Sequence, residues 1–408
     1  MTPKPKLLVL SHFLPFPPHG GAAIRTFNLL KGLAESFDIT LVAVSRFAHQ
    51  ATQPDVESAV AGCGAIARRV YVVREERPTV RRQVYAHLVS LVSQRPHTDF
   101  QSPFGALRAT IQKLMGEEHF DLFHVDAIDL APLLALFPAN RTVLNHHNVE
   151  SELLQRRATM KSGAIRLLIA LQSKLVDRQE RTVVPAVALN VAVSKRDAVH
   201  FDSLGSATPT VVAPNGADTA YFQPATQEAA GKEVVFVGGL SWFPNRDALE
   251  FYCDEILPII KQRYPDLITT WVGKATDEDL RNPRFSDVTL TGYVDDVREY
   301  VARARCILVP LRVGGGTRLK ILEAWAQGKA VVSTTVGCEG LAAENGSNIV
   351  IADSAQAFAN AVESMLEDKS PHATIGAAAR TTVESQYSWR MISKDLARAY
   401  NAIVHQTH

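Results

Sequence analysis

The chain has 408 residues, 46% of them hydrophobic and 21% charged, as expected for a globular protein with room for two domains of about 200 residues each. Its 43 lysines and arginines nearly balance its 42 aspartates and glutamates, and the net charge of +1 excludes a general attraction to nucleic acid. The four cysteines lie far apart, and no apolar run is typical of a transmembrane helix or a signal peptide. We therefore expect a cytoplasmic protein with reduced, buried thiols.

Short apolar runs alternate with helical patterns in the first half of the chain. A run at 6–11 is followed by a loop rich in proline and glycine, 12–21, and by a helical pattern over 22–37. The runs are continuously apolar, which favours a parallel sheet covered on both faces. The further apolar runs of this half lie at 38–45, 120–126, 141–148, 188–194 and 208–216, and helical patterns lie at 104–117 and from 129.

A second series of the same kind begins at residue 233, after a linker near 217–232. The sequence therefore predicts an α/β protein with two doubly wound, Rossmann-like halves. Ligands of such sheets bind beyond the carboxyl ends of the strands. The apolar runs of this half lie at 233–240, 268–274, 288–294, 306–311, 330–336 and 347–353, and helical patterns lie at 247–264, 297–305 and 317–327.

The most informative segment of the chain is 310–341. Three consecutive glycines, Gly314, Gly315 and Gly316, allow positive φ and close backbone approach, and an amphipathic helical pattern begins at Thr317. The unpaired N–H groups and the dipole of a helix N-terminus favour an anion there. A glycine-rich turn before a helix is more often a plain structural turn than a phosphate site, so the prediction depends on the residues that follow it.

Two cations and a carboxylate follow this loop. We expect Arg318 and Lys320 in the first helical turn, where cations oppose the helix dipole unless an anion lies among them. Glu323 lies roughly 7 Å further along the helix than Arg318, about the length of a diphosphate, where its carboxylate can accept ribose hydroxyls. The alternative for Glu323 is a solvated helix charge. The segment predicts a site for a nucleoside diphosphate.

The order of several motifs resembles the retaining glycosyltransferases of the GT-B fold, glycosyltransferase family 4. The resemblance covers most of the chain, and each motif alone is weak. The motifs are Gly20-Gly21 after the first strand, HNVE at 147–150, AVSKRD at 192–197, PNGADTAYFQP at 214–224, VFVGGL at 235–240, TGYVDDV at 291–297 and GGGTRLKILEAWAQGKAVVSTTVGCEGL at 314–341.

The resemblance implies two domains that face each other across a cleft. Residues 1–220 are expected to bind the acceptor, residues 221–385 to bind the sugar nucleotide, and a helix in 386–408 to cross back onto the first domain. The implied reaction moves a sugar, such as a hexose, from a nucleoside diphosphate to an acceptor hydroxyl with retention at the anomeric carbon. It requires neither a metal nor a cofactor, and the sugar nucleotide is a substrate.

Such a reaction must stabilise negative charge on the departing diphosphate, for which preorganised cations and N–H groups are suited. The catalytic candidates are Arg318, Lys320 and, by its place in the family motif near the donor sugar, His147. The candidates for donor binding are Gly20, Gly21, Gly314, Gly315, Gly316, Thr317, Glu323 and Asn215.

Two positions depart from the family pattern. Gly315 stands where many members carry the first glutamate of Glu-x7-Glu, which contacts the donor sugar. Gly238 and Gly239 stand where Gly-Arg and a following lysine are usual. We therefore expect the phosphate charge to fall on Arg318 and Lys320, with Arg246 or Arg312 as further contributors.

Two charged segments have alternative interpretations. The acidic triplet 277–279 has an Asp-x-Asp spacing but no flanking strand, so we expect a solvated loop there and no metal site. The segment 65–95 carries seven arginines and two glutamates among Tyr71, Tyr85, Leu88 and Leu91. This composition suits an anionic membrane surface or a lipid-diphosphate acceptor, and an ordinary exposed basic segment is equally favoured.

The predicted function is sugar transfer from a nucleotide sugar to a glycan or lipid-linked acceptor, in assembly of a bacterial exopolysaccharide or other surface glycan. The protein is expected in the cytoplasm, with peripheral contact at the inner membrane face. Two alternatives stay open, namely a sugar-nucleotide epimerase or hydrolase of the same fold and a non-catalytic sugar-nucleotide-binding partner. The base and sugar of the donor do not follow from the sequence.

Overall fold

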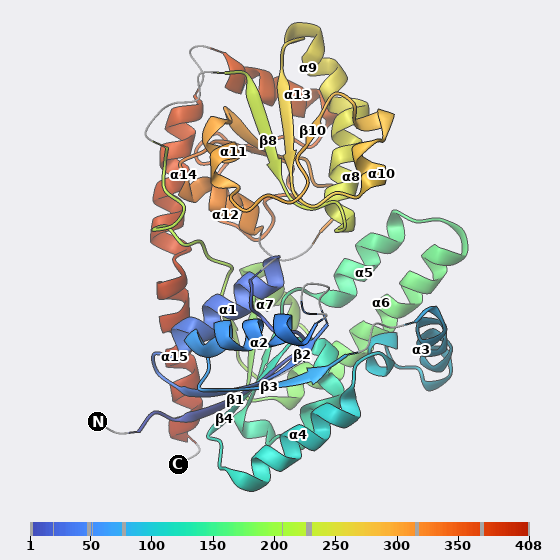
Figure 1. The fold of residues 1–408 in the computed structure, drawn as a ribbon, viewed down its shortest axis with the longest axis vertical. Helices are drawn as coiled ribbons and strands as arrows, with labels where there is room; N and C mark the ends of the chain where they lie inside the picture. Colours follow the sequence, from blue (N-terminus) through green and yellow to red (C-terminus); the bar gives the residue numbers. More distant parts are fainter. Residues whose placement is uncertain are drawn as a thin grey trace. The chain divides into compact units, whose positions relative to one another are not determined.

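A computed structural model describes residues 3–18, 20–46, 50, 52–75, 79–205, 207–225, 231–314, 318–367 and 371–406. The chain forms two compact units (Figure 1). The first unit comprises Met1–Pro214 and Trp389–His408, and the second comprises Asn215–Ser388.

The described residues of the first unit form a seven-stranded parallel sheet in the order β3-β2-β1-β4-β5-β6-β7. All five residues of β4 are buried, as expected for a strand covered on both faces. The strands are β1 (Lys6–Ser11), β2 (Asp38–Ser45), β3 (Arg69–Arg74), β4 (Leu122–Asp126), β5 (Thr142–Asn145), β6 (Leu189–Ala192) and β7 (Thr210–Val212).

Helices cover both faces of this sheet. Helix α4 packs its buried Leu107, Ile111 and Leu114 against strand residues such as Leu8 and Val42. The helices are α1 (Gly21–Leu33), α2 (Gln53–Gly62), α3 (Val80–Ser93), α4 (Phe104–Glu117), α5 (Glu150–Thr159), α6 (Gly163–Val183), α7 (Lys195–Asp202) and α15 (Trp389–Gln406).

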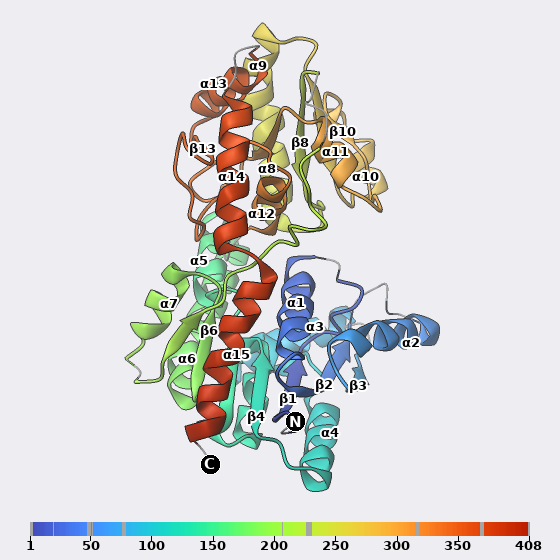
Figure 2. The same ribbon diagram turned by 90° about the vertical axis from the view of Figure 1, so that its left-hand side faces the viewer.

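The C-terminal helix α15 belongs to the first unit, where it lies beside α1 and β4 (Figure 2). The two helices approach so closely at Gly32 that a Cβ there would overlap the side chain of Ser393. Tyr400 of α15 also hydrogen-bonds through its hydroxyl to Nδ1 of His124 in β4, at 2.6 Å. The end of the chain is therefore part of the first unit's core.

In the described part of the second unit, six strands form a parallel sheet in the order β10-β9-β8-β11-β12-β13. At its centre the rings of Phe236 and Trp271 stack with centroids 3.6 Å apart. The strands are β8 (Glu233–Val237), β9 (Ile268–Val272), β10 (Thr289–Leu290), β11 (Cys306–Val309), β12 (Val331–Ser333) and β13 (Val350–Ile351). The α-helices are α8 (Phe243–Phe251), α9 (Leu257–Arg263), α10 (Asp277–Leu280), α11 (Arg298–Arg303), α12 (Leu319–Ala326), α13 (Ala355–Leu366) and α14 (His372–Gln386).

The predicted α/β class with two doubly wound parallel sheets is confirmed. Several local features differ from the sequence analysis. Residues 128–136 form a 3₁₀ helix, since in an α-helix the ring of Pro132 would clash with the carbonyl four residues earlier. The long helical pair α5 and α6 was not predicted. The division between the units lies at Pro214, earlier than residue 220, and Ala217 donates its N–H to the carbonyl of Tyr387 within the second unit.

Candidate active site

Lys320 lies in the first turn of α12 and reaches the end of β8. Its Nζ donates to Oδ1 of Asn245 at 2.8 Å and lies 3.7 Å from the centroid of the Phe236 ring. Gly238 follows β8 with a φ of +158°, and a Cβ there would lie 2.8 Å from Nζ of Lys320. The close approach of the lysine therefore requires a glycine at this position.

The charges around Lys320 favour an anion. Burial lowers the pKa of Lys320 well below its usual value, the positive charge of Arg318 lowers it further, and Glu323 opposes this shift. Burial raises the pKa of Glu323 to about 7, against the influence of Lys320. A phosphate bound beside Lys320 would supply the negative charge that stabilises the ammonium.

Arg318 precedes helix α12 and does not lie in its first turn as predicted. It occupies the N-cap position with φ −87° and ψ 102°, and its guanidinium donates to the carbonyl of Val336 at 3.3 Å. The guanidinium also lies over Gly314, where a Cβ would be 2.5 Å from NH2 of Arg318. Arg318 is 9% exposed. The predicted donor contacts Gly315, Gly316 and Thr317 lie outside the described residues.

Arg246 and Arg312, the expected further sources of phosphate charge, are each held by a carboxylate. Arg246 bonds to both oxygens of Asp279 at 2.7 and 3.1 Å, and Arg312 bonds to both oxygens of Asp247 at 2.8 and 3.1 Å. The acidic triplet 277–279 is not a solvated loop, because it begins α10 and Asp279 is buried in a capping box with Thr276. Of the cations predicted to hold the phosphates, Lys320 is the one that the structure places against the end of β8.

A second polar cluster lies at the carboxyl ends of β1, β4 and β5 in the first unit. Asp126, which ends β4, is fully buried. Its Oδ2 accepts hydrogen bonds from Thr26 at 2.7 Å and from Ser11 at 3.2 Å. Its Oδ1 accepts hydrogen bonds from Asn145 at 2.7 Å and from Nε2 of His147 at 3.0 Å. Burial alone would raise the pKa of Asp126, but His147 and the other donors hold it well below its usual value.

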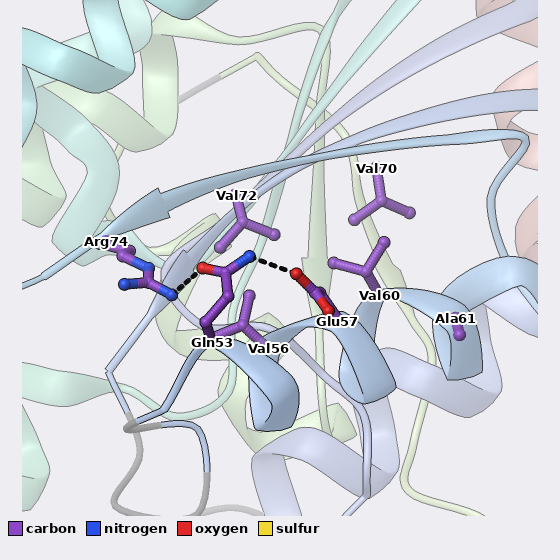
Figure 3. Close-up of a pocket in the computed structure, with 8 residues that line it drawn as sticks. All are labelled: Gln53, Val56, Glu57, Val60, Ala61, Val70, Val72 and Arg74. Carbon is purple, nitrogen blue, oxygen red and sulfur yellow. Dashed lines mark hydrogen bonds between the residues drawn. The ribbon is translucent and has the colours of Figure 1, made fainter.

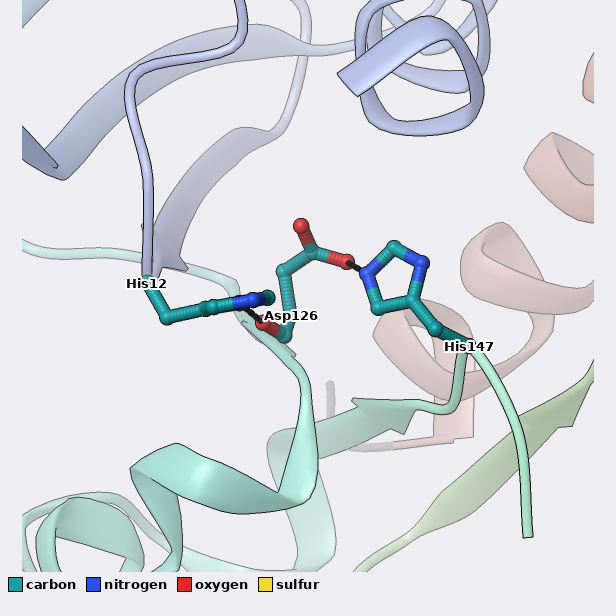
Figure 4. A group of neighbouring side chains, drawn as sticks. All are labelled: His12, Asp126 and His147. Carbon is teal, nitrogen blue, oxygen red and sulfur yellow. Dashed lines mark hydrogen bonds and ion pairs between the residues drawn. The ribbon is translucent and has the colours of Figure 1, made fainter. Parts of the chain in front are cut away.

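Two histidines flank this carboxyl group (Figure 4). His12 directs Nδ1 to the backbone carbonyl of Asp126 at 2.9 Å, and His147 directs Nε2 to its side chain. Atoms of these three residues lie within 4.8 Å of one another, which is close enough to hold a metal ion. The carboxylate already accepts four hydrogen bonds, so the observed arrangement is that of a hydrogen-bonded network.

His147, predicted from its motif, is therefore oriented by Asp126, which the sequence analysis did not single out. With Nε2 turned to the carboxylate, the other ring nitrogen points away from it (Figure 4). Three residues further on, Glu150 begins α5, and burial together with the charge of Asp129 raises its pKa to about 7. Asp126 is the last residue of the apolar run 120–126, and this place at a predicted strand end is the signal in the sequence that could have found it.

Gly20 and Gly21 begin helix α1 of the same unit. Gly20 has a φ of +89°, and a Cβ built on it would meet no atom within 4 Å. The N-terminus of α1 has no side-chain cap, which leaves its first N–H groups to other partners. Asn215, the last predicted donor contact, is the first residue of the second unit and is buried.

A cavity of about 480 Å³ lies elsewhere in the first unit, between α2 and the edge strand β3 (Figure 3). Its polar side chains bond to one another, since Gln53 donates to Glu57 at 2.6 Å and accepts from Arg74. None of the predicted site residues lines it. Its lining consists of Gln53, Val56, Glu57, Val60, Ala61, Val70, Val72 and Arg74.

Residues 231–368, which lie in the second unit, match the family model described as glycosyl transferases group 1. A protein from the cps region of Klebsiella pneumoniae is 30% identical to this chain over 135 residues. The match covers 31% of this chain and spans about a third, 35%, of that relative.

Solved structures share the fold of the whole chain. Anabaena HepE in complex with UDP-glucose is 15% identical with a TM-score of 0.64, over 97% of this chain and 99% of HepE. TarM is 9% identical with a TM-score of 0.68, over 97% of this chain and 99% of TarM. The fold is that of GT-B glycosyltransferases. In the part of the chain that the structure describes, no helix combines the length and apolar character needed to cross a bilayer.

Proposed function

We propose that this chain transfers a sugar from a nucleoside diphosphate to an acceptor hydroxyl, with retention at the anomeric carbon. The observation that carries the proposal is the partly buried ammonium of Lys320 beside Gly238, with Arg318 before the same helix and Glu323 one turn later. The group 1 glycosyl transferase model spans all of these residues. Two neighbouring cations and a carboxylate at a helix N-terminus suit a diphosphate and its ribose.

The second unit is the proposed donor domain. Lys320 and Arg318 stabilise the negative charge that develops on the diphosphate as the bond to the sugar breaks. Glu323, whose pKa lies near 7, accepts hydrogen bonds from ribose hydroxyls when ionised. The donor contacts predicted for Gly20, Gly21, Asn215 and the glycine loop stay predictions, as does the catalytic role of His147.

UDP-glucose is the first donor to test, because HepE has been crystallised with it. The cps-region relative supports an acceptor that is a growing surface polysaccharide or its lipid-linked precursor. The chemistry proposed for the site needs no metal, since Lys320 and Arg318 provide the positive charge. Metal independence is tested directly by assaying transfer in the presence of EDTA.

A thermal-shift panel with UDP, GDP, ADP and dTDP tests donor binding first. A nucleotide at about 100 times its Kd should stabilise the protein by ~2.7 kcal/mol, and the others should not. NMR of the product made with the matching nucleotide sugar then gives its anomeric configuration. Donor consumption without an acceptor would instead support a hydrolase or epimerase. Binding without any turnover would support a non-catalytic partner.

A further inference from the structure

Helix α3 turns its large apolar side chains outward. Its buried positions, Ala86 and Ser90, are small, and the opposite arc of the helix carries six exposed large apolar residues. A helix that packs on a core normally shows the reverse arrangement. The exposed residues of α3 are Val80, Val84, Tyr85, Leu88, Leu91 and Val92, with exposed fractions from 41% to 88%.

Polar contacts attach α3 to the rest of the first unit. Ser90 accepts a hydrogen bond at 2.9 Å from the Nε2 group of Gln172 in α6. His87 stacks on His97 with ring centroids 4.4 Å apart, and Gln172 also accepts from the backbone N–H of His97. Because small and polar groups hold the helix in place, its apolar arc is not needed for this packing.

The neighbouring hairpin of α5 and α6 extends the same kind of surface (Figure 1). The first turns of α6 are exposed, and they carry Ile165, Leu167 and Leu168. Among the described residues, α3 and this part of α6 hold more exposed large apolar side chains than all other elements together. We call these nine residues of α3 and α6 the apolar face.

Within the two segments that carry the apolar face every charged side chain is a cation, and Arg156 pairs with Glu152 just outside them. Residues 79–98 and 153–168 contain no aspartate or glutamate. Arg81 lies on the exposed arc, one helical turn before Tyr85, and Arg166 lies between Ile165 and Leu167. The cations of the two segments are Arg81, Arg82, Arg95, Arg156, Arg157, Lys161 and Arg166.

Two arginines of the basic segment 65–95 lie before α3 and form ion pairs within the protein. Arg68 pairs with Asp38 at 2.8 Å, and Arg69 pairs with Glu118, so both are neutralised beside the edge strand β3. Of the remaining arginines near α3, Arg95 pairs with Asp99 at 2.8 Å. Arg81 and Arg166 are exposed and lie among the residues of the apolar face, so we use these two cations to test its charge.

We propose that the apolar face docks the first unit on a bilayer that contains anionic phospholipids. Its large side chains enter the boundary between headgroups and acyl chains, and Arg81 and Arg166 lie among the lipid phosphates. The two segments combine exposed apolar side chains with cations and contain no acidic residue. The apolar side chains suit the acyl chains, and the cations suit the lipid phosphates. This inference is independent of the proposed sugar transfer, because it concerns a different part of the first unit.

Co-sedimentation with lipid vesicles tests the proposal. The wild-type protein should bind vesicles of phosphatidylcholine mixed with phosphatidylglycerol, and it should bind weakly to phosphatidylcholine alone. The variant Leu88→Glu with Leu167→Glu should lower binding at least about tenfold, since two charges would enter the apolar boundary. The variant Arg81→Gln with Arg166→Gln should lower it about fivefold per cation, which corresponds to ~1 kcal/mol each.

Two control variants carry the same kinds of substitution at exposed residues outside the apolar face. Val199→Glu replaces an exposed apolar residue on α7, and Arg281→Gln removes an exposed cation of the second unit. Both controls should bind vesicles as the wild type does. Circular dichroism should show unchanged folding in every variant, because all the altered side chains are exposed.

Two outcomes would overturn the proposal. One is wild-type protein that does not bind the anionic vesicles, or site variants that bind as well as the wild type. The other is a wild-type dimer that Leu88→Glu converts to a monomer without any vesicle binding, which would make the apolar face an interface between two copies. Neither outcome bears on donor binding, which is measured without lipid.

Discussion

Lys320 on α12 and Asn245 on α8 meet at the end of β8, with 2.8 Å between Nζ and Oδ1. The two residues are 75 positions apart in the chain. A neutral amide oxygen compensates an ammonium only in part, and burial holds the pKa of Lys320 well below its usual value. An anionic phosphate oxygen is a stronger acceptor than the amide, so the pair positions the cation for such a ligand.

Replacing Lys320 by methionine should weaken nucleotide binding without destabilising the free protein. A hydrogen bond to a charged group contributes about 1.5–3 kcal/mol, so the Kd for the nucleoside diphosphate should rise roughly ten- to a hundredfold. The free variant should unfold at the same or a higher temperature, because a buried cation is removed. Calorimetric titration and thermal unfolding measure the two effects.

Lys261→Met is the control for this change. Lys261 lies on α9 and pairs with Asp287 at the surface. Its loss should leave nucleotide affinity as in the wild type. An unchanged Kd in Lys320→Met would remove Lys320 from the site.

Replacing Glu323 by glutamine should change how stability depends on pH. Burial raises the pKa of Glu323 to about 7 from the ordinary 4.5, so the folded state holds this proton more tightly than the unfolded chain. The resulting stability is fully present below pH 4.5 and is lost as the pH rises to about 7. Over this window the wild type should lose up to about 1.4 kcal/mol per pH unit relative to Glu323→Gln.

Urea unfolding without nucleotide, repeated across this pH window, measures the difference. Glu299→Gln, which removes an exposed carboxylate on α11, should give a curve parallel to that of the wild type. A parallel curve for Glu323→Gln as well would show that Glu323 is solvated, as the alternative interpretation of the sequence holds.

Replacing Gly238 by alanine should impair both stability and nucleotide binding. The residue has a φ of +158°, and the new Cβ would lie 2.6 Å from Nδ2 of Asn245 and 2.8 Å from Nζ of Lys320. We expect a loss of about 1–3 kcal/mol in the free energy of unfolding, and a weaker affinity because Lys320 must move. Urea unfolding and titration with the nucleotide measure these changes.

Gly116→Ala is the matched control, since Gly116 lies in α4 and a Cβ there would meet no atom within 4 Å. Alanine should be neutral or stabilising by up to about 1 kcal/mol in a helix. Wild-type nucleotide affinity in Gly238→Ala would contradict the tight packing at the end of β8.

Two variants of His147 should separate its structural role from its catalytic role. In His147→Ala the carboxylate of Asp126 loses one of its four donors, which should cost about 1–3 kcal/mol of stability. In His147→Gln an amide can donate to Asp126 instead, so stability should stay closer to the wild type. If the imidazole acts in the reaction, kcat should fall in both variants.

Stability from urea unfolding and kcat with the identified donor are compared for each variant. His119→Ala, at an exposed residue that follows α4, should change neither quantity. Full activity in His147→Gln would assign His147 a structural role only.

For helices α3, α5 and α6 the sequence predicted least, namely neither the ion pairs of the arginines nor the direction of the apolar side chains. The arginines of 65–95 were recognised as a basic segment, but periodicity did not show which of them form ion pairs with Asp38 and Glu118. The direction of the apolar arc of α3 depends on a hydrogen bond between Ser90 and Gln172, 82 positions apart. A helical pattern indicates an apolar side, and it does not tell whether that side faces the core or the solvent.

The two doubly wound halves follow from the sequence alone, which also places polar and glycine residues at the ends of their strands. These features are local, because apolar runs, helix starts and glycine turns depend on neighbouring residues. The contact of Lys320 with Asn245 and the contact of His147 with Asp126 are visible only in the tertiary structure. The place of Arg318 at the N-cap position of α12, outside the first turn of the helix, is likewise a result of the tertiary structure. Such contacts join different elements of the chain, as the pair of His124 and Tyr400 does over 276 positions, and no local pattern encodes them.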